Sequence, residues 1–369
     1  MAAGAKAPQA VSGVFMEAYY YQHMTKPRQA AYHAMKAGFT ALSPAFSVPR
    51  LEARELSDIF FQLRLDCPDI FYVTGFSYRF AQGAENVELL PEYLFDKSKV
   101  KDHQKALAAR VAKLPRPAQA MTAWEKERYI HDFLCENVRY DKLKKPYSHE
   151  ITGPLGQGVG VCEGIAKSVK VLCDALGLWC VIAVSEANPE AGVKYRHAWN
   201  ILKLDGQYYH LDATFDNSLS HDGVIRRDYF NLDDSRVFRD HQRLLYPVPA
   251  CVKGDRFYYR EEKLSFTKVE DVVKRSQMSI RKDLPFVFHW RGGPLTREVL
   301  AELTANPSVE KGEYCIVADL SMLPPAQEPQ AAADALVVML AAIVHDEISI
   351  ADAAQRALDA GCPRNEVYR

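Results

Sequence analysis

The chain has 369 residues, 48% of them hydrophobic and 25% charged, which is enough apolar material for a sizeable core and roughly two or three domains. Its 46 basic and 47 acidic residues leave a formal net charge of -1, so no overall field exists to hold nucleic acid or an anionic membrane. The composition therefore favours a small or peptide-like partner, with neither nucleic acid nor membrane.

The apolar segments and the cysteines narrow the class further. Residues 1–14 lack the uninterrupted apolar core of a secretory signal, and the longest apolar run, 331–344, is shorter than the roughly 20 residues that a membrane span needs. The eight cysteines include no Cys-x-x-Cys pair and no framework spacing, which argues against structural zinc and a disulfide scaffold. We expect a cytoplasmic protein without cofactor or metal, in which one thiol needs a chemical explanation.

Residues 1–117 predict an N-terminal α+β region. Apolar side chains recur there at helical spacing, at Leu56, Ile59, Phe60 and Leu63. The aromatic-rich segment 71–80 is extended in pattern. A Pro-containing stretch, 114–117, separates this region from the next.

Residues 118–250 predict a second domain that begins with a helix. Thr122 and Glu125 form a capping box ahead of an apolar stripe. After the Gly-rich stretch 153–160, apolar residues at spacings of four, three and four predict a core-facing helix that ends near Gly177. These residues are Ile165, Val169, Leu172 and Leu176.

The strands of this domain follow. A short β-rich run at 181–184 precedes two stronger strands, 197–204 and 207–214, which Asp205-Gly206 separates. Asp-Gly between alternating segments indicates a two-residue hairpin turn.

Residues 251–369 predict a separate α/β region. It has apolar segments at 257–259 and 286–290, a helix around 299–303 and a strand at 314–320. An Ala-rich stretch, 326–342, suits a further helix.

Cys162 is the candidate nucleophile. It lies where the Gly-rich stretch meets the helix that begins near Glu163, and a helix N-terminus supports a thiolate because its unpaired N–H groups carry partial positive charge. Cys173 lies in the same helix on its apolar side, so only Cys162 is exposed by geometry.

The hairpin register supplies the partners. Leu204 pairs with Gln207, so His197 faces Thr214, and Asp212 becomes a diagonal neighbour of His197 at roughly 7 Å between Cα atoms. Asp212 would hold the imidazole and favour its charged form, giving a thiolate-imidazolium pair at neutral pH. The backbone N–H of Cys162 is a candidate oxyanion donor, and Gln157 is the candidate for a second. Trp199 either packs over the site or is a core tryptophan.

Other polar residues have structural interpretations. His210 lies on the same face as His197, but its hairpin diagonals hold no carboxylate, so it is predicted to be packed. For Asp216 we expect a turn or capping role, and for His131 a structural one. Glu163 in the first helical turn is a common dipole partner. The Gly-rich stretch lacks the Gly-Lys-Ser/Thr ending of a phosphate loop.

Three motifs resemble those of the transglutaminase-like superfamily, in the usual order. They are Gly-Val-Cys-Glu-Gly-Ile-Ala at 160–166, Arg-His-Ala-Trp-Asn at 196–200 and Tyr-His-Leu-Asp-Ala-Thr-Phe-Asp at 209–216. The resemblance covers about 120–245, where Asp240-His241 is similar to the family's ending. It implies a papain-like α+β core with Cys162 as nucleophile, His197 as base and Asp212 as orienting partner. Peptide N-glycanases, one branch of the superfamily, carry zinc-binding cysteine pairs near this domain. This sequence has no such pairs, which argues against deglycosylation as its activity.

Two functions remain open, because the superfamily includes crosslinking enzymes, proteases, amidases and inactive members. The first is a cysteine-dependent acyl-transfer enzyme acting on amide bonds of peptides or proteins, with hydrolysis favoured over crosslinking because water needs no second binding site. The second is a catalytically weak or inactive peptide-binding or protein-binding module.

Overall fold

The computed structural model describes residues 18–220, 223–282, 286–293 and 314–318. The chain divides into two compact units, Met1–Tyr258 and Tyr259–Arg369. Both combine helices with strands, so the predicted α+β class is confirmed. The finer division at 117/118 and 250/251 stays a prediction.

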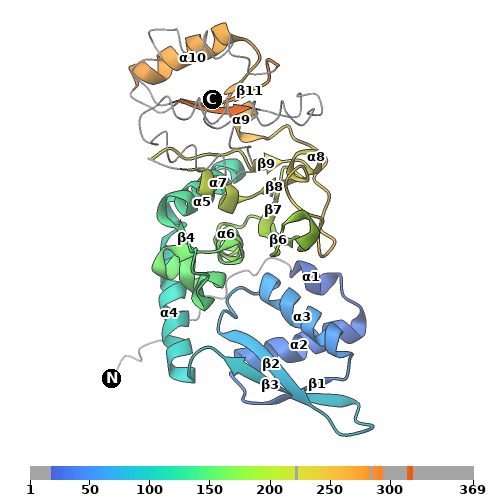
Figure 1. The fold of residues 1–369 in the computed structure, drawn as a ribbon. Coiled ribbons are helices and arrows are strands. Elements are labelled where there is room, and N and C mark those ends of the chain that lie inside the picture. The colour runs from blue at the N-terminus through green and yellow to red at the C-terminus, as the bar shows by residue number, and fades with distance from the viewer. Residues whose placement is uncertain (1–17, 221–222, 283–285, 294–313, 319–369) are drawn as a thin grey trace, which may run out of the picture. The chain divides into compact units, whose positions relative to one another are not determined.

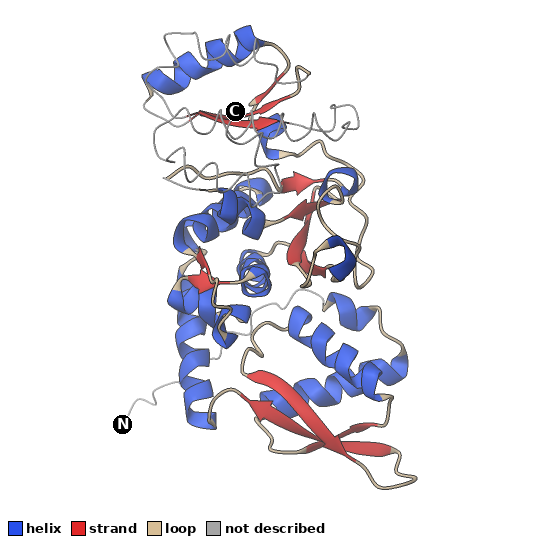
Figure 2. Cartoon of the chain, in the orientation of Figure 1, coloured by secondary structure: helices blue, strands red, loops and turns tan. Residues whose placement is uncertain are grey.

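The first unit begins with helices that cover one face of a three-stranded antiparallel sheet (Figures 1 and 2). The predicted helix around Leu56 is confirmed, since the apolar stripe of α3 is buried. The helices are α1 (Tyr19–Gln22), α2 (Lys26–Thr40) and α3 (Ala53–Asp66), and the strands, in sheet order, are β1 (Phe46–Pro49), β3 (Asn86–Tyr93) and β2 (Val73–Arg79).

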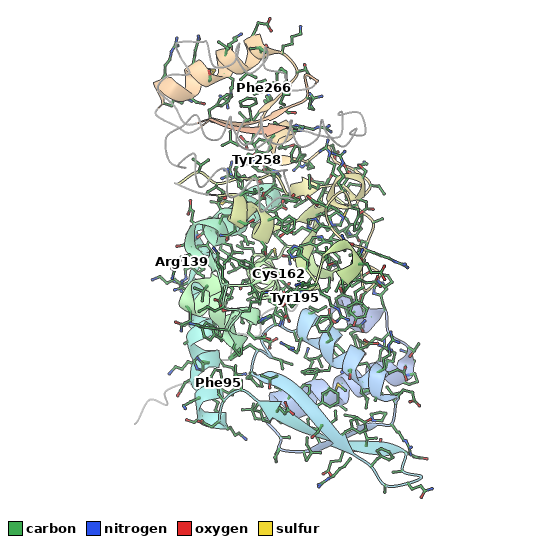
Figure 3. All side chains as sticks on the ribbon, in the orientation of Figure 1. Phe95, Arg139, Cys162, Tyr195, Tyr258 and Phe266 are labelled. Carbon is green, nitrogen blue, oxygen red and sulfur yellow. The ribbon has the colours of Figure 1, made fainter. Side chains whose placement is uncertain are left out.

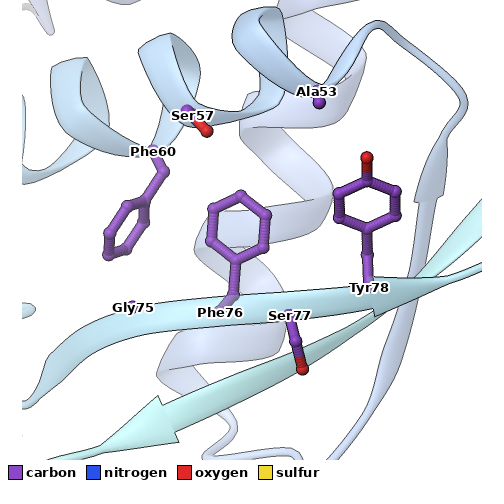
Figure 4. Close-up of a pocket in the computed structure, with 7 residues that line it drawn as sticks. All are labelled: Ala53, Ser57, Phe60, Gly75, Phe76, Ser77 and Tyr78. Atoms are coloured by element: carbon purple, nitrogen blue, oxygen red, sulfur yellow. The ribbon is translucent and has the colours of Figure 1, made fainter.

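A hollow of about 480 Å³ lies between α3 and β2 (Figure 4). Aromatic rings line it, with Phe60 from the helix facing Phe76 and Tyr78 from the strand. It belongs to this N-terminal layer alone, because all of its lining residues come from α3 and β2.

Helix α4 (Lys97–Lys113) and the 3-10 turn η1 (Arg116–Ala118) lead into the central part of the first unit. Its helices α5 (Ala123–Asn137) and α6 (Cys162–Leu176) pack against each other, and α6 also packs on a four-stranded antiparallel sheet (Figure 1). The sheet order is β6 (Cys180–Val184), β7 (Ala198–Leu204), β8 (Gln207–Leu211) and β9 (Phe230–Leu232).

Short elements complete this part. A two-stranded parallel sheet pairs β4 (Arg139–Tyr140) with β5 (Val159–Gly160). The remaining elements are the 3-10 helices η2 (Pro146–His149) and η4 (Pro189–Ala191), the π-helix η3 (Thr152–Gln157), and the α-helices α7 (Ala213–Leu219) and α8 (Asp234–Val237).

Local sequence signals explain the two main helices. The capping box at the start of α5 is confirmed, with the side chains of Thr122 and Glu125 each accepting the other's backbone N–H. Helix α6 ends at Leu176, and Gly177 follows with φ of 72°, a left-handed conformation that costs a residue without Cβ little.

The N-terminal layer packs into the central core. Tyr20 is buried, and its hydroxyl donates to the carbonyl of Ile182 at 2.6 Å. The carboxylate of Asp66 accepts the backbone N–H groups of Tyr20 and Tyr21 at 3.1 and 3.0 Å. Leu65 joins the same apolar cluster as strand β6, so the two layers share one core.

The described residues of the second unit include a parallel three-stranded sheet, of order β10–β11–β12, and the helix α10. The apolar segment 286–290 is a strand, and the predicted strand 314–320 is observed as Tyr314–Ala318, with 319–320 outside the described residues. The segment 257–259 runs into the short helix α9 (Tyr258–Glu261). The predicted helices at 299–303 and 326–342 and the apolar run 331–344 lie outside the described residues. The strands are β10 (Ser265–Phe266), β11 (Phe286–Trp290) and β12 (Tyr314–Ala318), and the helix is α10 (Val269–Arg281).

Within the part of the chain that the structure describes, none of the helices has the length and apolarity that crossing a membrane requires.

Candidate active site

Cys162, which is labelled in Figure 3, is the first residue of α6. It is half-buried, whereas Cys173 in the same helix is fully buried. Strand β5 leads directly into it, with Gly160 opposite Tyr140 of β4. The first N–H groups of an α-helix have no partner within the helix. The thiol therefore lies where a negative charge is supported by the helix terminus.

Glycine at position 164 allows the start of α6 to pack closely. A Cβ on Gly164 would lie 2.2 Å from the carbonyl oxygen of Ser148, which is much closer than atoms can approach. The same carbonyl accepts the N–H of Val161 at 3.0 Å. The residues on either side of Cys162 are thus fixed against η2.

His197 lies one residue before β7, and Ser185 holds its backbone. Its N–H donates to the hydroxyl of Ser185 at 3.0 Å, and its carbonyl accepts the N–H of Ser185 at 2.9 Å. Its Nε2 donates to Oδ2 of Asp212 at 2.6 Å. Cys162 lies close enough to this imidazole to contribute to raising its pKa. Because Nε2 is bound to Asp212, Nδ1 is the nitrogen left for the sulfur.

The hydrogen bond to Asp212 does not arise as the hairpin predicted. The register is confirmed from Leu204–Gln207 to Asn200–Leu211, but the second strand ends at Leu211 instead of 214, so the predicted His197–Thr214 pair was wrong. Asp212 is instead the N-cap of α7, and its Oδ1 accepts the N–H groups of Thr214 and Phe215 at 2.9 and 3.1 Å. An aspartate that can cap a helix competes with continued strand pairing.

The charge states follow from these contacts. Burial alone lowers the pKa of His197, but the charge of Asp212 and the hydrogen bond to it, aided by Cys162, raise it to about 10. Burial opposes the ionised form of Asp212, yet the two imidazoles bound to it hold its pKa well below the ordinary value. The imidazolium and the carboxylate are therefore the neutral-pH forms.

His241 is a member of the site that the residue-based reasoning missed. Its Nε2 donates to the same Oδ2 of Asp212 at 2.8 Å, and its Nδ1 contacts Oδ1 of Asp240 at 2.6 Å. It follows β9 and α8, so no hairpin register could bring it near Asp212. The available signal was the Asp240-His241 pair at the end of the family-like region.

Trp199 lies behind His197. It is 1% exposed, belongs to the hydrophobic core and stacks on the imidazole with ring centroids 5.7 Å apart. Its Nε1 donates to Nδ1 of His210 at 2.9 Å. Nε2 of His210 donates to Asp234 at 2.8 Å, so the carboxylate partner of this packed histidine comes from α8, outside the hairpin.

Gln157 is the last residue of η3 and is exposed. It is followed by Gly158, whose φ of 65° turns the chain into β5. Its role as a second oxyanion donor stays a prediction.

Glu163 belongs to a cluster of charges that we call the α6 ion cluster, defined as Arg64, His149, Glu150, Glu163 and Lys167. Lys167 is fully buried and donates to Glu163 at 2.7 Å and to Glu150 at 2.9 Å. Burial opposes ionisation of Glu163, but Lys167, His149 and Arg64 hold its pKa far below the ordinary value. Besides sitting in the first helical turn, Glu163 thus ties the start of α6 to α3 and η2.

His131 and Asp216 lie in the buried helical layer. His131 contacts Asp132 at 3.0 Å and Asp216 at 2.9 Å. Asp216 accepts the N–H groups of Asp228 and Tyr229 at 2.7 and 3.0 Å. Asp216 thus fixes the backbone of the loop before β9, in agreement with the turn alternative of the prediction, whereas the N-cap of α7 is Asp212.

Two groups of side chains bring metal-ligand atoms within 4.8 Å of one another, namely His197, Asp212 and His241, and His210, Asp234 and Cys251. In the first group, Nε2 of each histidine is already hydrogen-bonded to Asp212. In the second, His210 is bonded to Asp234 in the same way. The histidine nitrogens that could bind a metal are therefore already used in hydrogen bonds to carboxylates.

The site combines a half-buried thiol, an imidazole and a buried carboxylate on a mixed α+β core. This is the arrangement of a thiol-dependent catalytic triad. Residues 105–213 match the profile of the Transglutaminase-like superfamily. The chain therefore contains a transglutaminase-like domain, as the three motifs predicted.

Several solved structures are similar over part of their length. One is a crystal structure of a TGase (13% identity, TM-score 0.26), with 46% of this chain and 51% of that chain covered. Another is a candidate cysteine protease from Cytophaga hutchinsonii (15%, TM-score 0.25), with 38% and 61% covered. A third is a candidate protease from Parabacteroides distasonis (14%, TM-score 0.21), with 38% and 36% covered.

The chain thus spans about half the length of the first of these structures and less than two thirds of the others. No curated protein matches it. The family profile, and not the solved structures, carries the assignment.

Proposed function

We propose that the chain is a cysteine-dependent acyl-transfer enzyme that acts on amide bonds of peptide or protein substrates, with water as the usual acceptor. The observation that carries the proposal is the half-buried thiol of Cys162 facing an imidazole that a buried carboxylate holds in its charged form. Nucleophile, base and orienting group are the parts that acyl transfer requires.

The steps follow from the atoms present. The sulfur of Cys162 attacks the acyl carbon, and the carbonyl oxygen becomes an oxyanion that N–H groups at the start of α6 stabilise. His197 gives its proton to the departing amine as the C–N bond breaks, leaving a thioester on Cys162. His197 then takes a proton from water, whose oxygen attacks the thioester; the C–S bond breaks, a carboxylic acid is released, and the thiolate of Cys162 is regenerated beside protonated His197.

Hydrolysis is favoured over crosslinking because water needs no binding site of its own. An amine would react with the same thioester and give a new amide, but it would have to be bound next to the sulfur. The two outcomes share every step up to the thioester, so residues Cys162, His197 and Asp212 have the same roles in both.

Intact mass spectrometry tests the proposal. The purified protein and its Cys162→Ala variant are incubated with a peptide library, with and without an added amine, and both the peptides and the protein mass are followed. We expect cleavage products and a transient acyl adduct only with the parent protein. Peptide binding with identical product profiles for the two proteins would sink the enzyme proposal and support a binding module instead.

Alkylation of the thiol gives a second test that needs no substrate. An imidazolium beside the sulfur favours the reactive thiolate. We expect Cys162 to react with iodoacetamide at about pH 6 much faster than Cys135, the other half-buried cysteine among the described residues. Equal rates for the two thiols would contradict the activated-cysteine claim.

A further inference from the structure

His241 is held between two carboxylates in the interior of the first unit. Its side chain is fully buried, with Nε2 at 2.8 Å from Oδ2 of Asp212 and Nδ1 at 2.6 Å from Oδ1 of Asp240. An ionised carboxylate can only accept hydrogen bonds.

The other oxygen of each carboxylate is an acceptor too. Oδ1 of Asp212 accepts two backbone N–H groups at the start of α7, and Oδ2 of Asp240 accepts the hydroxyl of Tyr229. Since both carboxylates face His241 as acceptors, each ring nitrogen of His241 must donate. The ring therefore carries two protons and a positive charge.

This cation shares one oxygen atom with the imidazole of the active site. Oδ2 of Asp212 accepts from His197 at 2.6 Å and from His241 at 2.8 Å, and the ring centroids of the two histidines are 5.3 Å apart. The negative charge of Asp212 is thus divided between two imidazoles. His197 experiences less of that charge than it would in a simple pair.

We propose that His241 is a positioning residue for the reaction, whose positive charge fixes Asp212 and limits how tightly Asp212 makes His197 keep its proton. The inference rests on the proposed function, in which His197 must release a proton to the departing amine. An imidazolium bound to an unshared carboxylate would be a weaker acid and would slow that step.

Aromatic rings and titratable side chains surround His241. The rings of Trp199 and Phe215 pack against it, at centroid distances of 4.8 and 4.6 Å. The titratable groups that face it are Asp212, Asp240, His197, His210 and the hydroxyl of Tyr229. Both aspartates have pKa values below the ordinary one and that of His241 is raised, in agreement with the donor assignment.

The unmodified protein gives the first test. Nitrogen NMR of ¹⁵N-histidine-labelled protein distinguishes an imidazolium from the two neutral tautomers. We expect His241 to be doubly protonated at about pH 7, because both its nitrogens donate. A neutral His241 ring at that pH would overturn the proposal.

A pair of variants that differ in charge gives the second test. In His241→Gln the cation is lost, and we expect the titration of His197 to move up by about one pH unit and kcat to fall about tenfold, with KM little changed because His241 does not lie at the thiol. His241→Lys keeps a cation and should restore the titration of His197 to near the parent value. An unchanged His197 titration in folded His241→Gln would refute the inference.

His131 offers a matched control, because it too is fully buried and bonded to two carboxylates, Asp132 and Asp216. His131→Gln should lower stability and leave the His197 titration unchanged. An equal shift in both Gln variants would mean that loss of packing explains the effect, and would overturn the proposal. The NMR titrations need no turnover, so a parent protein without activity would defeat the proposed function while leaving this inference testable.

Discussion

Asp212 uses its two oxygens for two different tasks, and Asp212→Asn separates them. The Oδ1 atom caps α7, and an asparagine oxygen can accept the same two N–H groups. The Oδ2 atom accepts from two imidazoles, whereas the Nδ2 that replaces it in the variant is a donor. The substitution therefore keeps the cap and removes the acceptor for His197 and His241.

The pKa of His197 sets the stability that Asp212→Asn should lose. Raising its pKa from 6.5 to about 10 corresponds to roughly 5 kcal/mol of differential stabilisation, as an upper bound. About 19% of the side chain is exposed, so solvent screening reduces this value. We expect Asp212→Asn to lose about 2–4 kcal/mol at pH 7 and about 10⁴-fold in acyl transfer, because the imidazole loses its orienting partner.

The pH dependence gives the decisive assay. Since the folded-state pKa of His197 lies above its unfolded value of 6.5, the stabilisation is complete below 6.5 and is lost as the pH rises through about 10. Urea unfolding of the parent and Asp212→Asn should thus give stabilities that differ most just below pH 6.5 and converge as the pH rises through about 10. A difference that stays constant from pH 6 to beyond 10 would refute the reasoning.

Four further substitutions test how the surroundings of Cys162 support the nucleophile. Lys167→Met removes the fully buried cation that pairs with Glu150 and Glu163 and leaves only Arg64 and His149 to oppose these carboxylates. It should cost about 3–5 kcal/mol in urea unfolding and slow iodoacetamide labelling of Cys162. Lys170→Met, a buried lysine further along α6, should lower stability without changing the labelling rate; equal slowing would contradict a local effect. Gly164→Ala should lower the melting temperature by an amount equivalent to about 1–3 kcal/mol, because its Cβ meets a backbone oxygen. Thr122→Ala should cost about 1 kcal/mol of cap energy and leave labelling unaffected, and a larger loss would point to a role beyond the cap.

The parts of the fold that the sequence predicts are those fixed by neighbours in the chain. Asp205-Gly206 sets the hairpin register because a two-residue turn leaves only one way to pair the strands, and that register is observed. The capping box at Thr122 and the end of α6 at Gly177 are equally local. The start of α6 at Cys162 follows from the same kind of signal.

The contacts that the sequence does not predict join residues far apart in the chain. His241 lies 29 positions beyond Asp212, and Asp234 lies 24 beyond His210. Nothing in the periodicity of a strand or helix encodes which distant side chain returns to a given carboxylate. The error at Asp212 has a different cause, since a strand pattern and a capping residue competed at one position and the cap prevailed.

The ionised groups beside Cys162 alternate in sign from one neighbour to the next. A sulfur at a helix start faces the imidazolium of His197, which contacts the carboxylate of Asp212, then the imidazolium of His241 and the carboxylate of Asp240. Because each charge is stabilised by those beside it, neutralising one changes the proton affinity of the next. Substitutions along this line should therefore be non-additive, with the double variant of Asp212 and His241 losing less than its two single variants added together.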